Sequence, residues 1–312
     1  MTSVDVHIGP GDEQVFGGIA SLYNAVGRYE NPDHFELDGE YLSRSFSRLG
    51  IDPNRDITVA RTADGQIVGL GHLRLRNTSP PVGYFAVLVH PEYRRRGIGT
   101  RVLTRIEEMG REREMETLQC NVPSFSPDAV RFAEKHGYRK TGEWIKMAHT
   151  SITEIDRPEA PADLTIAEIQ DTDADVWADL QNTIFRGSFQ YEEVTGKTFL
   201  SWTRREGFNR DLFLFGLTDG RPVAYCLGWC FTARDNSDYK SVHIHGIGVL
   251  PEYRGRGYGR TLLQEVLWRA ARVGMTKSEL VVNSDSVAAI ALYRTLGYRQ
   301  RYARIWYEKK IK

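Results

Sequence analysis

The chain reads Val87-Leu-Val-His-Pro91-Glu-Tyr-Arg94-Arg-Arg-Gly97-Ile-Gly99 in its first half and Ile247-Gly-Val-Leu-Pro251-Glu-Tyr-Arg254-Gly-Arg-Gly257-Tyr-Gly259 in its second. The two prolines lie 160 residues apart (251 − 91 = 160), and a later Gly-Tyr pair repeats at the same spacing (297 − 137 = 160). In each copy a hydrophobic run leads through a basic, glycine-rich turn into an amphipathic pattern with helical spacing. The sequence therefore predicts a duplicated unit of strand, glycine turn and helix.

The glycine turn of each copy has the features of an anion-binding site. Glycine allows the backbone to adopt positive φ and to approach a ligand closely. The first amides of a helix, together with the helix dipole, favour a phosphate group, and arginines add charge-assisted donors. The spacing is neither the dinucleotide fingerprint nor a Walker loop, because no Gly-Lys-Ser/Thr follows. A turn of this kind that binds nothing is the alternative, and two copies in matching contexts weigh against it.

Composition favours two ordinary globular domains. The 312 residues are 41% hydrophobic and 11% aromatic, and acidic and basic residues balance at 41 each. A balanced charge gives no overall field that attracts nucleic acid or a membrane surface. The three cysteines do not form a disulfide framework. Because no apolar stretch approaches the roughly 18 residues of a membrane helix and the first residues lack a signal-peptide core, we expect a cytoplasmic protein.

The segment 155–163 contains two prolines among charged residues and reads as a linker. We therefore expect an N-terminal domain at 1–154 and a C-terminal domain at 164–312. Both halves mix helices and strands in the same order, with hairpin turns near Gly65 and Gly220. This order predicts an α+β fold in which a central, mostly antiparallel sheet is flanked by helices.

These motifs resemble those of the GCN5-related N-acetyltransferases, the GNAT family. The acyl-CoA signature of that family, Gln/Arg-x-x-Gly-x-Gly/Ala, is matched by Arg94-x-x-Gly97-x-Gly99 and by Arg254-x-x-Gly257-x-Gly259. Its last signature segment resembles Ala289-x-x-Leu292-Tyr293-x-x-x-Gly297-Tyr298, with Phe132-Ala133-x-x-x-Gly137-Tyr138 as the first-copy relative. The stretch from Ser284 to Ile290 is similar to the catalytic half of mycothiol synthase, a tandem member of the family. The resemblance covers nearly the whole chain as two tandem domains.

The resemblance implies acetyl-CoA as the acyl donor, no metal, and a sheet splayed beside the motif strand. The pantetheine arm would enter this gap as an added strand does, and Gly248 fits a bulge that directs an N–H toward the thioester carbonyl. Asn283 and Ser286 would contact the cofactor or cap the last helix, and capping is the better explanation of Ser286. Carried over by position, the cofactor-binding residues are Ile247, Val249, Leu250, Arg254, Gly255, Arg256, Gly257, Tyr258, Gly259, Arg260, Asn283 and Ser286, with Leu88, Val89, Arg94, Arg95, Arg96, Gly97, Ile98, Gly99 and Thr100 in the first copy.

The two halves differ where protons would be transferred. In the family a tyrosine on the last helix protonates the leaving thiolate; Tyr293 holds that place, and its counterpart is Ala133 (293 − 160 = 133). The family often has a glutamate six residues before the last valine of the motif strand. Here His243 matches it, with His245 two residues further on the same strand face, and Gly83 holds the matching place in the first half. Either histidine is a candidate to accept the proton of the amine, directly or through water. The alternative is that both are ordinary half-buried strand residues.

We therefore expect an acetyl-CoA-dependent N-acetyltransferase that modifies a primary amine of a small molecule or peptide. The C-terminal domain would do the chemistry. The N-terminal domain would keep only the cradle, by which we mean the glycine turn and helix start that would hold the diphosphate. A non-catalytic acyl-CoA sensor or a scaffold protein is the alternative. We expect a monomer or homodimer that binds neither nucleic acid nor membranes. Candidate walls of the acceptor site, unless they only fill the core, are Trp202, Phe208, Trp229 and Tyr191.

Overall fold

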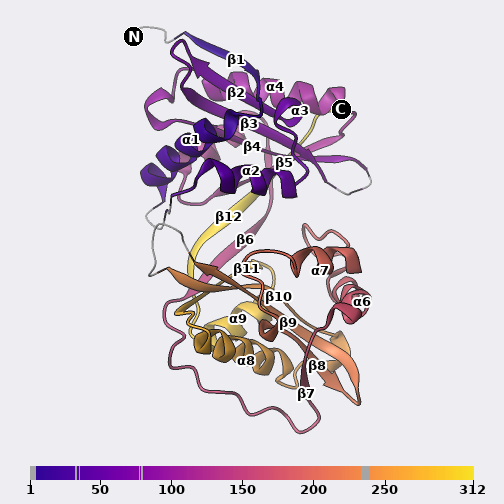
Figure 1. Ribbon diagram of the computed structural model, residues 1–312. Helices are drawn as coiled ribbons and strands as arrows, with labels where there is room; N and C mark the ends of the chain where they lie inside the picture. The colour runs from indigo at the N-terminus through magenta and orange to yellow at the C-terminus, as the bar shows by residue number, and fades with distance from the viewer. Residues whose placement is uncertain (1–4, 32–33, 35, 77, 79, 233–238) are drawn as a thin grey trace. The chain divides into compact units, whose positions relative to one another are not determined.

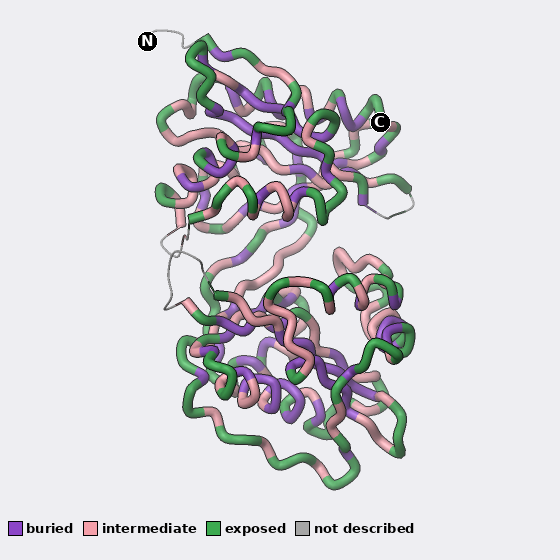
Figure 2. The backbone as a smooth tube through the Cα atoms, viewed as in Figure 1, coloured by how far each residue is buried: buried purple, intermediate pink, exposed green. Residues whose placement is uncertain are grey.

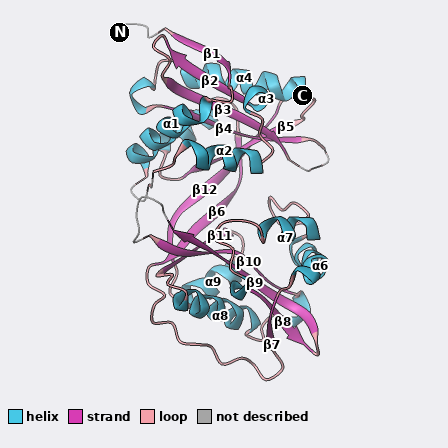
Figure 3. Ribbon diagram, viewed as in Figure 1, coloured by secondary structure: helices cyan, strands magenta, loops and turns pink. Residues whose placement is uncertain are grey.

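A computed structural model describes residues 5–31, 34, 36–76, 78, 80–232 and 239–312 (Figure 1). The chain forms two compact units, one of Met1–Gly142 with Arg304–Lys312 and one of Glu143–Ala303. Each unit contains a mixed sheet with helices on both faces, as Figure 3 shows by secondary structure. The predicted α+β class is confirmed.

The first unit follows the predicted order of elements. Helices α1 and α2 cover one face of its sheet, where Ile19 and Phe46 join the core, and α4 covers the other face with Val102 and Ile106. The strand order is β1-β2-β3-β4-β5-β12, in which β4 and β5 are parallel. Its elements are β1 Val6–Pro10, α1 Val15–Glu30, α2 Gly39–Arg48, α3 Pro53–Asp56, β2 Ile57–Thr62, β3 Ile67–Leu75, β4 Val82–Val89, η1 Pro91–Tyr93, α4 Ile98–Glu112, β5 Thr117–Pro123, α5 Pro127–Lys135 and the start of β6 Arg139–His149.

The second unit repeats this plan with the strand order β6-β11-β10-β9-β8-β7. Helices α8 and α9 lie on one side of the sheet and α6 and α7 on the other (Figure 1). Burial is concentrated in the central strands and on the helix sides that face them (Figure 2). Its elements are the end of β6, β7 Thr165–Glu168, η2 Asp171–Asp173, α6 Ala174–Phe185, α7 Gly196–Trp202, η3 Arg210–Leu212, β8 Phe213–Thr218, β9 Arg221–Thr232, β10 Lys240–Val249, η4 Pro251–Tyr253, α8 Tyr258–Arg272, β11 Lys277–Asn283, α9 Val287–Thr295 and the start of β12 Arg299–Lys310.

The last strand of each repeat crosses from one unit into the other. Residues 144–149 of β6 pair antiparallel with β11 in the second unit, and residues 304–310 of β12 pair antiparallel with β5 in the first. Each sheet is therefore completed by a strand from the other half of the sequence. The boundaries of the compact units consequently differ from the sequence boundaries at 154 and 164, because strand pairing between distant segments leaves no local sequence signal.

The state of the cysteines and the apolar length of the helices can be compared with the sequence analysis. Cys120, Cys226 and Cys230, all within the described part of the chain, are free thiols, as predicted. None of the helices built from described residues is long and apolar enough to cross a bilayer.

Candidate active site

In both units the strand before the glycine turn separates from its parallel neighbour. Pairing of β10 with β11 ends at Ile244 and Leu280, although the two strands continue to Val249 and Asn283. In the first unit the same separation begins after Tyr84. Strand ends that diverge leave backbone N–H and C=O groups for an extended ligand. The predicted splay beside the motif strand is confirmed.

The second glycine turn presents open space and helix-end amides. Gly257 is the N-cap of α8 with a φ of +85°, and Gly255 has a φ of +78°. A Cβ atom built at either glycine would meet nothing within 4 Å. The first intrahelical bond runs from the Thr261 N–H to the Gly257 carbonyl (3.0 Å), so the preceding amides have no intrahelical acceptor. Arg254 Nε donates to the Val249 carbonyl (3.1 Å) and fixes the turn against the end of β10. This geometry fits a diphosphate.

Three side chains of this turn have protein partners. The buried Tyr258 hydroxyl donates to Asp163 Oδ2 (2.5 Å), and the Arg256 guanidinium lies 3.7 Å from the same carboxylate. Arg260 donates to Thr295 Oγ1 (3.1 Å). These contacts position the turn through its side chains and leave its backbone amides available. The other residues predicted to bind the cofactor in this copy lie at the strand end and the helix start: Ile247, Val249, Leu250 and Gly259.

The end of β11 brings Asn283 and Ser286 to the start of α9. The Asn283 side-chain oxygen accepts the Asp285 N–H (3.1 Å). Ser286 is the N-cap residue of α9 but forms no side-chain cap hydrogen bond with any described residue, so the predicted capping role is wrong. Its ψ of 62° lies outside the extended region in which a capping side chain reaches the first amides. The counterpart of Asn283 is Pro123 (283 − 160 = 123), which offers no amide group.

A carboxylate lies beside the first cradle. Arg94 Nε donates to the Val89 carbonyl (3.2 Å), as in the second copy. Its Nη2 also lies 2.6 Å from Glu30 Oε1, and the other oxygen of Glu30 accepts the Ser126 hydroxyl (2.5 Å). Because Arg94 follows β4 and Ser126 follows β5, Glu30 spans the mouth of the gap between these strands. Arg254 has no acidic partner among the residues that the structure describes.

The rest of the first turn keeps the backbone of the second. Gly97 is the N-cap of α4 with a φ of +77°. Arg95 has a φ of +61° where the second copy has a glycine, and its side chain lies 2.8 Å from Asp128. Thr100 Oγ1 lies 3.1 Å from His136 Nε2. The remaining predicted residues, Leu88, Arg96, Ile98 and Gly99, belong to the same strand end, turn and helix start.

A β-bulge lies at His245, not at Gly248 as predicted. The register of β10 against β9 changes between Ile244 and Gly246, which leaves His245 as the extra residue. Gly248 instead gives close packing, since a Cβ there would lie 3.0 Å from atoms of both Ile184 and Tyr225. A bulge adds one residue to one strand and redirects its backbone. Position 245 itself is not a glycine, so residue type did not distinguish it from the glycines at 246 and 248.

The bulge also changes which residues correspond. His243 pairs with Glu279, and in the first unit Tyr84 pairs with Gln119. Glu279 and Gln119 differ by 160 residues, whereas His243 and Tyr84 differ by 159, because only β10 has the extra residue. Tyr84, and not Gly83, is therefore the structural counterpart of His243. The first unit has a tyrosine at this place whose hydroxyl accepts the Asn121 side-chain amide (3.0 Å).

The two histidines have different surroundings. The ring of His243 stacks on Phe231 (centroids 5.5 Å apart), and its Nε2 lies 3.3 Å from Glu279 Oε2 without hydrogen-bond alignment. Burial, helped by the charge of Lys146, lowers the pKa of His243 to about 4. His245 keeps exposed surface, but its ring packs against Trp202 (4.6 Å), which removes hydration. This burial and then the Arg205 charge lower the pKa of His245 to about 4. Both rings are neutral at pH 7.

Tyr293 lies on α9 with 5% of its surface exposed. Its ring contacts Tyr298 (centroids 5.9 Å apart), and its hydroxyl donates to no described residue. Burial raises the pKa of Tyr293 well above its usual range, and nearby Cys226 adds to the shift. The phenol is therefore protonated at neutral pH and free to donate. The first unit has Ala133 in the corresponding helix.

Of the aromatic residues considered as acceptor walls, most fill the core. Phe208 and Trp229 pack on Phe213 (4.8 and 5.9 Å between centroids). Trp202 is buried but reaches His245. Tyr191 donates to Asn182 Oδ1 (2.5 Å). Sequence reasoning missed three polar residues: Glu30 beside the first cradle, and Lys146 and Glu279 beside His243.

Comparison with known proteins assigns the family. Residues 21–138 and 174–298 match the model of the acetyltransferase (GNAT) family. The chain belongs to this family. The GNAT assignment makes the protein an acetyl-CoA-dependent N-acetyltransferase, as predicted, and nothing supports the alternative of a non-catalytic sensor or scaffold.

Similar proteins extend over both units of this GNAT protein. The mycothiol acetyltransferase of Salinispora arenicola is 28% identical over 303 residues, which cover 96% of this chain and 94% of the relative. A GCN5-related N-acetyltransferase of Sphaerobacter thermophilus has a TM-score of 0.82 at 24% identity, covering 98% and 96% of the two chains. A tandem GNAT protein of the clavulanic acid biosynthesis pathway has a TM-score of 0.75 at 19% identity and covers 99% of each chain. The tandem arrangement is thus shared by whole-length neighbours.

Proposed function

We propose that the second unit transfers the acetyl group from acetyl-CoA to a primary amine of a small molecule, and that the first unit has no turnover. The observation that carries this proposal is the difference between two superficially similar cradles. The second has an open glycine turn, a protonated Tyr293 and a neutral His243. The first has Glu30 across its strand gap and Ala133 in place of the tyrosine.

The proposed chemistry uses His243 and the bulge on β10 together with Tyr293 on α9. The amine nitrogen attacks the thioester carbonyl, a C–N bond forms and the C–S bond breaks. Tyr293 gives its proton to the departing thiolate. His243, neutral at pH 7, takes the proton of the amine directly or through water. The bulge at His245 interrupts the strand ladder, and a freed N–H there would stabilise the oxyanion.

The first candidate for the acceptor is the unacetylated form of mycothiol, because full-length relatives have the name mycothiol acetyltransferase. The proposal is tested by measuring release of free CoA with this amine, with amino sugars, with amino acids and with peptide N-termini. We expect one of the small amines to give the highest kcat/KM. Acetylation of peptides alone would contradict the small-molecule assignment.

The ion pair between Glu30 and Arg94 predicts how many CoA molecules each protein chain binds. In the native protein we expect isothermal titration to detect one equivalent of CoA, because the Glu30 carboxylate competes with phosphate for Arg94 and repels it. Glu30→Gln removes this charge and keeps the side-chain shape, so a second equivalent should bind at the first cradle. Glu40→Gln, on an exposed ion pair with Arg44, is the matched control and should bind one. Two equivalents in the native protein would show that Glu30 does not block the site.

A further inference from the structure

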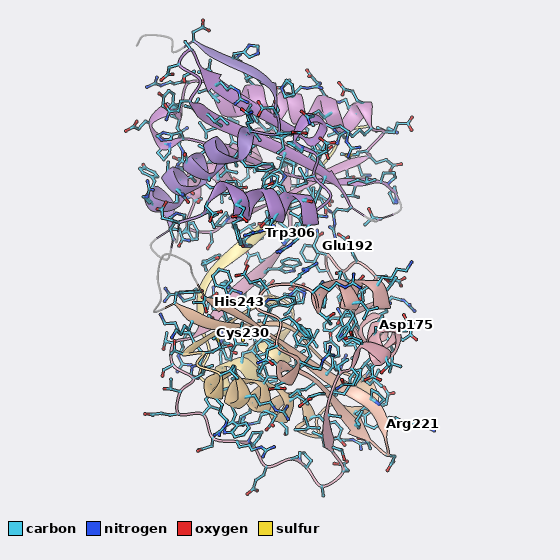
Figure 4. The ribbon with its side chains drawn as sticks, in the orientation of Figure 1. Asp175, Glu192, Arg221, Cys230, His243 and Trp306 are labelled. Atoms are coloured by element: carbon cyan, nitrogen blue, oxygen red, sulfur yellow. The ribbon has the colours of Figure 1, made fainter. Side chains whose placement is uncertain are left out.

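Three ionisable side chains lie in a row on neighbouring strands of the second unit. Lys146 on β6 places its Nζ 2.5 Å from Glu279 Oε2 on β11, and the same oxygen lies 3.3 Å from His243 Nε2 on β10. The exposed fractions of the side chains are 18%, 20% and 37%. A half-buried carboxylate between two basic groups is stabilised only if its partners stay in place. Figure 4 labels His243 in this unit.

We propose that Lys146 is a positioning residue of the acetyl-transfer site, which holds the Glu279 carboxylate beside the His243 ring. The inference rests on the proposed function, in which His243 serves the second unit. Lys146 precedes the second repeat in sequence and reaches this site only because β6 crosses between the units. The site is thereby completed by the first half of the chain.

The first unit shows that the fold does not require this ionic row. Lys146 pairs with Val281, and in the first unit Trp306 pairs with Asn121, so Trp306 is the counterpart of Lys146 (281 − 121 = 160 and 306 − 146 = 160). The three counterparts are therefore a tryptophan, Gln119 and Tyr84. The rings of Trp306 and Tyr84 are 5.6 Å apart. The same positions pack without an ion pair among them, and Figure 4 labels Trp306 in the first unit.

Burial is the main cause of the low pKa of His243, and the charges that face its ring modify this shift. Lys146 and His245 lower its pKa, and Glu279 raises it. Burial raises the pKa of Glu279, but the charge and hydrogen bond of Lys146, with help from His243 and Tyr239, hold it below the usual range. Glu279 is therefore ionised while Lys146 is present. Without Lys146, its positive charge no longer opposes protonation of His243. The Glu279 carboxylate then favours binding of a proton by the His243–Glu279 pair.

The test is the titration of His243 in a Lys146→Met variant. We expect the pKa of His243, followed by NMR of labelled histidine and assigned with His243→Gln, to rise by about one unit or more, the usual effect of one nearby charge. The acidic limb of the kcat/KM–pH profile should move up by the same amount. Lys146→Arg should restore both. Lys240→Met, on an exposed part of β10, changes the net charge equally and should move neither.

The two readouts separate the inference from the function on which it rests. An unmoved His243 titration in Lys146→Met overturns the proposed coupling, whatever happens to turnover. If the pKa of His243 changes in Lys146→Met but the pH dependence of kcat/KM does not, His243 takes no part in the proposed chemistry. The positioning role of Lys146 is then overturned as well.

Discussion

Replacing Tyr293 by phenylalanine should lower kcat about ten- to a thousand-fold with little change in the affinity for acetyl-CoA, the effect expected when a general acid is lost. The hydroxyl is buried, protonated at neutral pH and without an acceptor among the described residues, so its removal breaks no hydrogen bond within the described part of the protein. Phenylalanine keeps the ring contact with Tyr298. The measurement is steady-state turnover beside titration of CoA binding.

Tyr298→Phe is the control for an indirect effect through packing. The Tyr298 hydroxyl lies 2.5 Å from Ser278 Oγ, and its loss should reduce the free energy of unfolding by about 1 kcal/mol. Turnover at a temperature where the variant is folded should remain near that of the native protein. If Tyr293→Phe turns over at the native rate, Tyr293 has no part in proton transfer. If both variants lose turnover equally, packing around α9 explains the loss.

The fold could be predicted from the sequence where the signal is local. The hairpin of β2 and β3 around Gly65 and the start of α4 and α8 directly after a glycine turn follow from turn glycines and the repeated motif. The exchange of β6 and β12 could not be predicted, because either strand would complete either sheet by pattern alone. Register against β11 or β5 is decided by side chains that meet only after the chain has folded.

The residues of the candidate site, too, could be predicted only where the signal is local in sequence. The spacing of the glycine turn located Gly257, and the resemblance to the last signature segment of the family located Tyr293. The correspondence of His243 with Tyr84 was hidden by a single extra residue at His245. Glu30 and Lys146 lie far in sequence from the residues that they contact. Contacts between residues so far apart in sequence have no characteristic spacing by which they could be predicted.

Gly257→Ala should raise the KM for acetyl-CoA about ten- to a hundred-fold. A Cβ at a φ of +85° is strained and costs about 1–2 kcal/mol. It also enters the open space in front of the helix amides, where the diphosphate would lie. Loss of one charged hydrogen bond, worth about 1.5–3 kcal/mol, gives a change of this size. Initial rates against acetyl-CoA concentration measure it, with the free energy of unfolding determined in parallel.

Gly97→Ala is a control matched in geometry. Gly97 is also a helix N-cap, its φ is +77°, and a Cβ there likewise meets nothing within 4 Å. The strain is nearly the same, so the free energy of unfolding should fall by a similar amount in both variants. Only Gly257→Ala should raise the KM, because only the second cradle would hold the acetyl donor during turnover. A larger rise in KM for Gly97→Ala than for Gly257→Ala would show that the first unit is the catalytic one. Equal rises would show that both cradles bind acetyl-CoA during turnover.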